Sequence, residues 1–225
     1  MSRRTLHRII VFSLLALSLP TAAEQKQKNI KQIAQAVDRR YNNLQSLVAD
    51  FSETYRGPGI FRGESGTLWL KKPGKMRWEY HQPTEKLFIS DGKTAWFYVV
   101  GERQARKAPL KKLDDLRSPL RYLLGKTRLE KEFDALSFAP DVALINAGGV
   151  VLRGVPKAMA DRLSQVLLEV TPDGYIARIV AQEIDGSSTE FRFSNFKEDV
   201  TVSDQRFRFS PPAGVDVIEA GELGP

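Results

Sequence analysis

The side chains that most often perform covalent chemistry are scarce in this sequence. The chain of 225 residues has two histidines and no cysteine. His7 lies near the N-terminus, and His81 stands beside Gln82-Pro83 in a predicted turn, a setting typical of a solvated loop residue. A Ser-His-Asp triad or an HExxH zinc site therefore lacks its parts, and no G-x-S-x-G motif is present. We predict a protein that is not an enzyme and that has no cofactor and no metal site.

One short segment looks like the end of a phosphate-binding loop, namely Gly125-Lys126-Thr127. The first glycine that such a loop requires would fall at Leu120, and the segment follows a predicted helix instead of a strand. Gly125 is better explained as the residue that ends this helix. The carboxylates are scattered without a paired motif, so the sequence gives no support to glycosidase chemistry.

The N-terminus has the pattern of a secretory signal peptide. Arg3, Arg4 and Arg8 form a basic region, the apolar run Ile9 to Leu19 follows, and small residues end at Ala23. The apolar run is too short to span a membrane. We expect residues 1–23 to be removed and residues 24–225 to form a single domain in the periplasm. Because cysteine is absent, this domain cannot carry the lipid anchor of a bacterial lipoprotein.

The charge of the chain does not indicate a nucleic-acid partner. The sequence has 34 Lys and Arg against 27 Asp and Glu, a net charge of +7, and three of the arginines belong to the predicted signal peptide. Basic residues occur in runs of no more than two, such as Lys111-Lys112. We interpret the charges as a solvated surface.

The first half of the expected domain combines one helix with a meander of strands. Apolar residues from Ile30 to Phe51 recur at helical spacing, which predicts one long amphipathic helix. Residues 66–98 then read as four short antiparallel strands that contain all three tryptophans. The turn signals between them are Pro73-Gly74, His81 to Thr84, and Asp91-Gly92.

The second half returns from helices to strands. Leucines at positions 110, 113 and 116 indicate an amphipathic piece, Ser118 to Leu124 a helix that Gly125 ends, and Leu129 to Phe133 a further short helix. Alternating apolar residues then predict about six strands, at 143–145, 150–152, 166–170, 176–180, 191–193 and 207–209. Segregated strands and helices predict an α+β fold with helices on one face of a large antiparallel sheet. Composition does not distinguish a closed barrel from an open curved sheet.

Several segments in order along the chain resemble the LolA family of periplasmic lipoprotein carriers. They are K-K-P-G-K-M-R-W-E-Y at 71–80, P-x-E-x-L-x-I-S-D-G-K-T-x-W-x-Y at 83–98, Pro119-Leu120 with Leu123-Leu124-Gly125, and the segment Phe209 to Ile218. This resemblance covers nearly all of the expected domain. It implies an incomplete antiparallel β-barrel with a lid of about three α-helices that encloses a hydrophobic cavity.

The resemblance also implies which residues form the cavity. Met76, Trp78 and Tyr80 share one strand face, a pattern that taken alone is more typical of core packing. The family's cavity wall includes the positions of Met76 and Trp78, and we expect the acyl-chain cavity to be lined by Met76, Trp78, Tyr80, Leu87, Ile89, Trp96, Leu120, Leu123 and Leu124. The two faces of the strand around residues 94–99 are both apolar, so the sequence does not assign them.

Two residues depart from the family pattern. Lys72 stands where an arginine ties the sheet to the lid, and Met76 replaces a phenylalanine. Lysine lacks the planar fork of arginine, so a latch made by Lys72 holds less rigidly. Lys72 is either this latch, with carbonyl groups of the helix at 118–125 as acceptors, or a solvated turn residue.

The function that the resemblance implies is carriage of lipoproteins from the inner to the outer membrane by a periplasmic chaperone. The implied partners are acylated lipoproteins as cargo, the ABC-type complex LolCDE as donor and LolB as acceptor, and we expect a monomer. The alternative is a different binding module, either a carrier of another lipid or a lipoprotein-sensing stress regulator that resembles RseB. The sequence alone does not separate these alternatives or identify the cargo.

Overall fold

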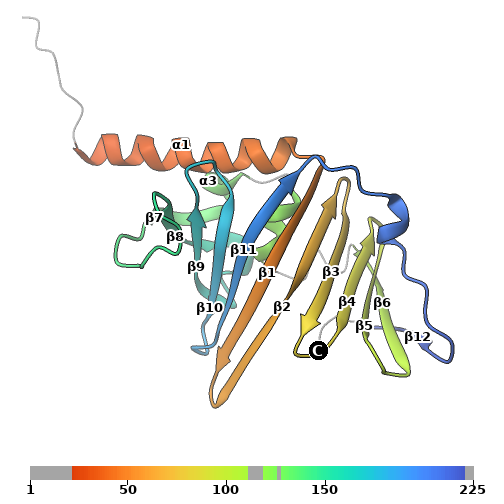
Figure 1. The fold of residues 1–225 in the computed structure, drawn as a ribbon. Coiled ribbons are helices and arrows are strands. Elements are labelled where there is room, and N and C mark those ends of the chain that lie inside the picture. Colours follow the sequence, from red (N-terminus) through yellow and green to blue (C-terminus); the bar gives the residue numbers. More distant parts are fainter. Residues whose placement is uncertain (1–21, 111–118, 126–127, 221–225) are drawn as a thin grey trace, which may run out of the picture.

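The computed structural model of the chain describes residues 22–110, 119–125 and 128–220 (Figure 1). Almost all of the predicted signal peptide lies outside these ranges, as do Leu113, Leu116 and Ser118 of the predicted helical region. Within the described ranges, no helix combines the length and the apolar character that crossing a membrane requires.

The described residues form one large sheet, two α-helices and three short 3-10 helices. The helices are α1 (Ala22–Asn43), α3 (Leu129–Glu132), η1 (Pro119–Leu124), η2 (Lys157–Met159) and η3 (Asp204–Phe207). The predicted count of about three α-helices is therefore not confirmed for this part of the chain. The strands are β1 (Ser46–Gly57), β2 (Ile60–Lys71), β3 (Lys75–Gln82), β4 (Lys86–Asp91), β5 (Thr94–Val99), β6 (Gln104–Pro109), β7 (Phe133–Phe138), β8 (Val150–Pro156), β9 (Leu163–Val170), β10 (Ile176–Glu183), β11 (Ser188–Glu198) and β12 (Asp216–Glu219).

Helix α1 begins and ends earlier than the apolar pattern predicts. It ends at Asn43, and the predicted continuation to Phe51 is wrong because residues 46–57 form β1. Leu44, Leu47 and Phe51 satisfy a helical spacing, but Leu47, Ala49 and Phe51 also alternate along a strand and are all buried. The ladder that joins β1 to β2 along its whole length decides between the two patterns.

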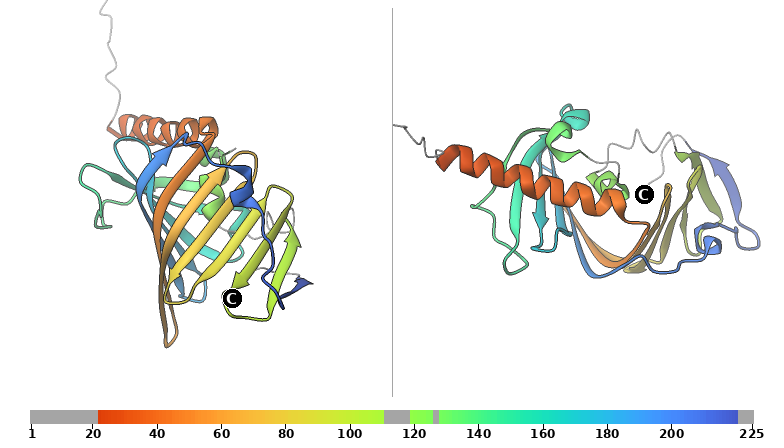
Figure 2. Two further views of the ribbon diagram at one scale, coloured as in Figure 1. Left: turned by 45° about the vertical axis from the view of Figure 1, so that its right-hand side comes forward. Right: turned by 90° about the horizontal axis from the view of Figure 1, so that it is seen from above.

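The sheet is open and strongly curved. Its twelve strands follow the order β12-β6-β5-β4-β3-β2-β1-β11-β10-β9-β8-β7, so β12 and β7 form free edges. Neighbouring strands are antiparallel, except that β12 pairs in parallel with β6. The open curved sheet is thus the correct choice between the two architectures that composition allowed. Figure 2 shows the curvature, with α1 lying across the hollow side of the sheet.

The predicted turns at Pro73-Gly74 and Asp91-Gly92 are present, the turn predicted at 81–84 begins only after Gln82, and four strands were missed, β1 among them. Gly74 and Gly92 adopt φ values of 65° and 96° at the turns that flank β3 and β5. Predicted strands at 150–152, 166–170, 176–180 and 191–193 lie within β8 to β11. The strands predicted at 143–145 and 207–209 are wrong, because residues 143–145 are loop, Phe207 ends η3 and residues 208–209 follow it without regular structure. The sequence also did not predict β6, β7 or β12: β6 has no large apolar residue, β12 has only four residues, and β7 begins at Phe133, the predicted end of a helix.

The two faces of the sheet are covered by different segments. The concave face packs against α1, η1 and α3 and forms the main apolar core. On the convex face, residues 139–149 cover β8 to β10, where Ala139 packs with Val151, Leu167 and Val180. The C-terminal segment, residues 199–220, runs along the convex face from β11 to β12 (Figure 2). Both faces of the sheet therefore carry apolar side chains. Those on the concave face pack against the helices, and those on the convex face pack against residues 139–149 and the C-terminal segment.

Candidate functional site

Trp78 lies in the middle of the concave wall. Met76, Trp78 and Tyr80 of β3 share this face, as their spacing predicts, and Met76 and Trp78 belong to the main core. The indole ring of Trp78 makes edge contacts with Phe51, at 4.8 Å between ring centroids, and with the rings of Phe191 at 5.9 Å and Phe193 at 6.2 Å. Strands from both halves of the chain thus build one apolar wall around this ring.

The phenylalanines of this wall were not among the predicted site residues. Phe51 was assigned to a helix, so its position on a strand was missed. Phe191 and Phe193 were correctly predicted to alternate on a strand, but the sequence does not reveal that β11 pairs with β1 and so lies close to β3. Local sequence patterns do not reveal which distant strands pair, and this pairing is what places Phe191 and Phe193 beside Trp78.

The helices close over this wall as a lid. Ala34, Val37 and Tyr41 of α1 are fully buried against it, and the Tyr41 hydroxyl accepts a hydrogen bond from the Ile176 backbone N–H at 3.0 Å. Burial raises the pKa of the Tyr41 hydroxyl, so it remains a neutral hydrogen-bonding group. The same lid includes η1 and α3, whose packing completes the cover on this side.

The short helices η1 and α3 form the second part of the lid, and α3 is hydrogen-bonded to α1. The Asp38 carboxylate of α1 accepts a hydrogen bond from the Leu129 backbone N–H, at 3.2 and 3.3 Å from its two oxygens. Leu123 is buried and Leu124 is half-buried in the main core. Leu120 lies in η1, but its side chain is outside the described part of the structure. Two of the three predicted lid leucines thus face the concave wall.

Three predicted wall residues lie on the opposite face of the sheet. Trp78 pairs with Phe88 across β3 and β4, so Leu87 and Ile89 point with Arg77 to the convex side. Ile89 in turn pairs with Trp96 of β5. The prediction that Leu87, Ile89 and Trp96 extend the concave wall is therefore wrong. Its cause is that β4 and β5 are apolar on both faces, so their sequences show no alternation that would assign the faces.

The C-terminal segment explains why these strands are apolar on the convex side. The ring of Phe209 packs against Trp96, at 6.4 Å between centroids, and against Tyr98 at 5.8 Å. On the concave side the strands present Phe88 and Phe97 instead, in a smaller cluster with Ala95 and Ala108. This arrangement also settles the faces of the strand at 94–99, which the sequence left open.

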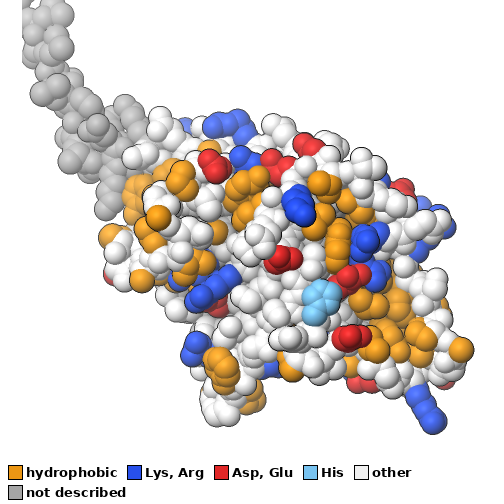
Figure 3. Space-filling model, viewed as in Figure 1, with side chains coloured by type: hydrophobic (Ala, Val, Ile, Leu, Met, Phe, Trp, Pro, Cys, Tyr) orange, Lys and Arg blue, Asp and Glu red, His pale blue; other side chains and the backbone are white. Residues whose placement is uncertain are grey.

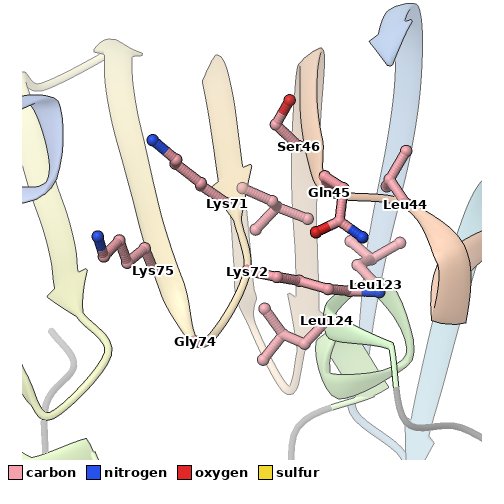
Figure 4. A pocket seen from close by; sticks show the side chains of 10 residues that line it. Leu44, Gln45, Ser46, Lys71, Lys72, Gly74, Lys75, Leu123 and Leu124 are labelled. Carbon is pink, nitrogen blue, oxygen red and sulfur yellow. The ribbon is translucent and has the colours of Figure 1, made fainter. Parts of the chain in front are cut away.

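Lys72 connects the sheet to the lid. It lies in the turn between β2 and β3, and its Nζ donates hydrogen bonds to the backbone carbonyl oxygens of Tyr41 at 2.6 Å and Asn42 at 2.8 Å (Figure 4). These carbonyls end α1, where the helix dipole favours a cation. Partial burial lowers the pKa of Lys72, and the carboxylate of Asp199 opposes this shift. The acceptors were predicted in residues 118–125, but the structure gives them as the carbonyl oxygens at the end of α1.

Gly125 allows η1, the end of α1 and the turn between β2 and β3 to pack closely beside Lys72. It adopts φ = 75° directly after η1, so it ends the helix as predicted. A Cβ atom at this position would lie 2.5 Å from the Tyr41 carbonyl oxygen and 2.9 Å from Lys72 Nζ. Only glycine therefore allows the end of η1 to pack against the bond between α1 and the sheet.

The space beside this junction is almost closed. A cavity of about 10 Å³ lies between Leu44 and Leu70 of the sheet side and Leu123 and Leu124 of the lid. This volume is about that of one water molecule, whereas pockets for drug-sized ligands reach roughly 300–1,000 Å³. A larger depression of about 360 Å³ lies next to it and is lined mainly by polar residues, including Lys71 and Asp199. The apolar wall is thus covered by its lid in this structure.

The concave wall becomes charged at the end away from α1. Lys86 Nζ donates to both carboxylate oxygens of Glu64, at 2.6 and 2.7 Å, and both side chains are 7% exposed. The Tyr80 hydroxyl donates to Glu53 Oε2 at 3.1 Å. Burial raises the pKa of Glu53, which the bond from Tyr80 partly offsets. The sequence did not predict this cluster, because alternating charged residues are more typical of a solvated strand face.

His81, the candidate base, lies in β3 and is exposed. Its Nε2 atom is 3.2 Å from Thr67 Oγ1. No group of three or more His, Asp or Glu residues among the described residues has the geometry to hold a metal ion.

The comparisons with known proteins agree with this architecture. Residues 42–210 match the family model of the outer membrane lipoprotein carrier protein LolA. The chain belongs to the LolA family. The outer-membrane lipoprotein carrier protein of Nitrosospira multiformis is 31% identical over 78% of this chain and 83% of its own length. That of Nitrosomonas europaea is 27% identical over 93% of this chain and 96% of its own length.

A solved structure has a similar fold. The Mycobacterium tuberculosis lipoprotein LppX matches with a TM-score of 0.51 at 13% identity, over 78% of this chain and 99% of its own length. At this identity the likeness concerns the fold alone. The family to which this chain belongs is one of carriers, not one of enzymes.

Proposed function

We propose that this protein carries acylated lipoproteins through the periplasm and shields their acyl chains against its concave face. The observation that carries the proposal is the apolar wall around Trp78, which is covered by a lid that Lys72 joins to the sheet. Membership of the LolA family supports this role. The cargo would replace lid side chains on the wall instead of entering a preformed cavity.

Opening of the lid is the central step of the proposed mechanism. Met76 and Trp78 are 9% and 5% exposed in the closed form, so α1 and η1 must move away from the sheet before an acyl chain can reach them. The bonds from Lys72 to the Tyr41 and Asn42 carbonyls break in this movement. The acyl chain then contacts the wall at Met76 and Trp78 and the inner side of the lid at Leu123 and Leu124.

The energy of acyl burial sets a limit on how tightly the lid closes over cargo. A chain of roughly 16 carbons gains on the order of 12 kcal/mol at about 0.8 kcal/mol per buried methylene. Several chains together would exceed the limit of about 20 kcal/mol for non-covalent affinity. A reversible carrier therefore covers its cargo incompletely. A single lysine, whose side chain is only partly buried, suits a lid that opens readily.

The route of the cargo follows from the same proposal. The signal peptide at residues 1–23 directs the chain to the periplasm, where residues 24–225 act as a monomer. The donor is a LolCDE-type complex of the inner membrane, and the acceptor is a LolB-type protein of the outer membrane. The family supports these partners, and binding of the purified proteins would test each of them.

A displacement experiment tests the proposed cargo. A fluorescent apolar probe is bound to the protein and titrated with a synthetic lipoprotein N-terminal peptide, in its acylated and its deacylated form. We expect stoichiometric probe binding and displacement by the acylated peptide alone. Equal displacement by both peptides, or no probe binding, would contradict the proposal. Mass spectrometry of material that co-purifies from the periplasm identifies the natural cargo.

A further inference from the structure

The hairpin formed by β1 and β2 projects beyond the rest of the molecule. Both strands have 12 residues and stay paired to the last rung, Gly57 opposite Ile60, with Pro58-Gly59 as the turn. Figures 1 and 2 show that this end lies furthest from α1 in both side views. We call residues 54–63 the hairpin tip. Its continuous ladder makes the tip a stiff projection and not a loose loop.

The hairpin tip exposes large apolar side chains. Phe61 is 68% exposed and Ile60 is 57% exposed, the first and third highest fractions among the large hydrophobic residues that the structure describes. The second is Ile184, at 63%, which lies in the neighbouring turn between β10 and β11. Figure 3 shows hydrophobic side chains gathered on this projection. Their exposure is not needed for the fold, because they contribute nothing to the cores.

Each face of the hairpin tip also carries an arginine beside an aromatic ring. Arg56 lies over the ring of Phe61, 4.9 Å from its centroid, and Arg62 lies over the ring of Tyr55 at 5.6 Å. These residues are direct cross-strand pairs. The guanidinium groups are thereby held close to the apolar end, with their donors available to solvent or a ligand.

The acidic residues of the hairpin are turned away from this end. Glu64 binds Lys86 and Glu53 accepts the bond from Tyr80, both within the concave wall. Residues 54–63 contain no acidic residue. In the neighbouring hairpin, Glu183 ends β10 and Asp185 lies in the turn, where its carboxylate accepts bonds from the Ser187 N–H and hydroxyl. The hairpin tip itself is thus apolar and cationic.

We infer that the hairpin tip inserts into the surface of an anionic phospholipid membrane. Apolar side chains at the end of a projection enter the interface between head groups and acyl chains, where aromatic residues are favoured. Guanidinium groups directly behind them meet lipid phosphates, which they bind in a planar, bidentate manner. A protein partner fits less well, because a specific interface covers about 800 Å² on each side and a pointed tip of ten residues has no flat or hollow surface.

Vesicle co-sedimentation tests this inference without reference to cargo. The protein recovered from the periplasmic fraction, with its N-terminus determined, is mixed with phosphatidylcholine vesicles or with vesicles that also contain phosphatidylglycerol. We expect weak, reversible binding to the anionic vesicles that falls as salt is added. I60S/F61S should lower the partition coefficient by about tenfold or more. R56Q/R62Q should lower it by about fivefold for each arginine, on anionic vesicles alone.

Matched controls distinguish vesicle binding through the hairpin tip from nonspecific hydrophobic adsorption. L144S removes an exposed apolar side chain elsewhere, Leu144 in the loop 139–149, which is 46% exposed, and should leave vesicle binding unchanged. Circular dichroism verifies that each variant is folded. The inference is overturned if wild type does not bind anionic vesicles, or if I60S/F61S binds them as wild type does. It is equally overturned if the tip substitutions change the oligomeric state in solution and not the vesicle binding. None of these outcomes bears on the peptide displacement test above.

Discussion

Lys72 Nζ lies 2.6 Å from the backbone carbonyl oxygen of Tyr41, so one flexible side chain joins the turn between β2 and β3 to the last turn of α1. The contact joins the two layers that must part if cargo is to reach the wall. An arginine would present a planar fork to the same carbonyls, whereas lysine presents a compact ammonium group. We therefore predict that the strength of this bond sets how often the empty protein opens.

Substitution of Lys72 should change the kinetics of probe binding in opposite directions. Lys72→Leu removes both bonds to α1, and after allowance for solvent screening we expect a loss of about 1 kcal/mol from the closed form. This corresponds to about fivefold faster probe association. Lys72→Arg should slow association. Stopped-flow fluorescence measures both rates, with Lys75→Leu as control, because Lys75 pairs with exposed Asp204 instead of α1. Unchanged rates in both Lys72 variants would make Lys72 an ordinary turn residue.

Gly125→Ala should open the lid from the opposite side of the same junction. The added Cβ would lie 2.5 Å from the Tyr41 carbonyl oxygen, and φ = 75° is unfavourable for alanine by about 1 kcal/mol or more. Gly186→Ala is the control, because Gly186 has φ = 87° but nothing within 4 Å. We expect faster hydrogen exchange in α1 for Gly125→Ala than for the control. Equal exchange in the two variants would show that only backbone strain matters.

Trp78 and Trp96 allow a comparison of the two faces of the sheet. Trp78→Glu places a carboxylate on the concave wall and should reduce probe binding by at least about tenfold, since an unpaired charge in an apolar site is strongly disfavoured. Trp96→Glu places it on the convex face, against Phe209, and should leave probe binding intact. Fluorescence titration measures the affinities, and circular dichroism checks the fold. Loss of binding in both variants, or in neither, would contradict the assignment of the concave face.

Glu53 and Glu64 face each other across β1 and β2, yet their replacement should have opposite effects on stability. Glu64→Gln leaves the buried ammonium of Lys86 without its carboxylate and should cost about 3–5 kcal/mol. Glu53→Gln removes a carboxylate whose pKa is raised by burial but keeps an acceptor for Tyr80, so it should raise the stability at neutral pH. Thermal unfolding measures both changes.

The effect of Glu53→Gln should depend on pH. Because the pKa of Glu53 is higher in the folded than in the unfolded protein, the ionised carboxylate opposes folding above both pKa values. As the pH falls below both values, wild-type Glu53 becomes protonated in both states and this penalty disappears. The stabilisation by Gln should therefore shrink on acidification. A difference in melting temperature that is constant with pH would mean that the carboxylate of Glu53 is not desolvated.

Local patterns predicted the elements well where turn chemistry was strong. The turns at Pro73-Gly74 and Asp91-Gly92 delimited β3 to β5, and alternation identified the face of Met76 and Trp78. Alternation failed at Leu87 and Trp96, because the C-terminal segment buries the convex face of β4 and β5 as well. The acceptors of Lys72 were missed for a related reason, since the predicted helix at 30–51 extended past the true end of α1 at Asn43. In each case the sequence did not reveal a contact between segments that are far apart along the chain.

The ladder between β1 and β11 has a consequence for how the chain folds. It lies in the middle of the sheet and pairs Phe51 with Phe193, residues that are far apart in the sequence. Strands β1 to β6 and β7 to β11 are two meanders that can form from local contacts, but the central ladder requires closure of a long loop. A chain still emerging from the ribosome or from a translocation pore therefore lacks half of its concave wall. The carrier acquires its apolar wall only when β11, one of its last strands, is available.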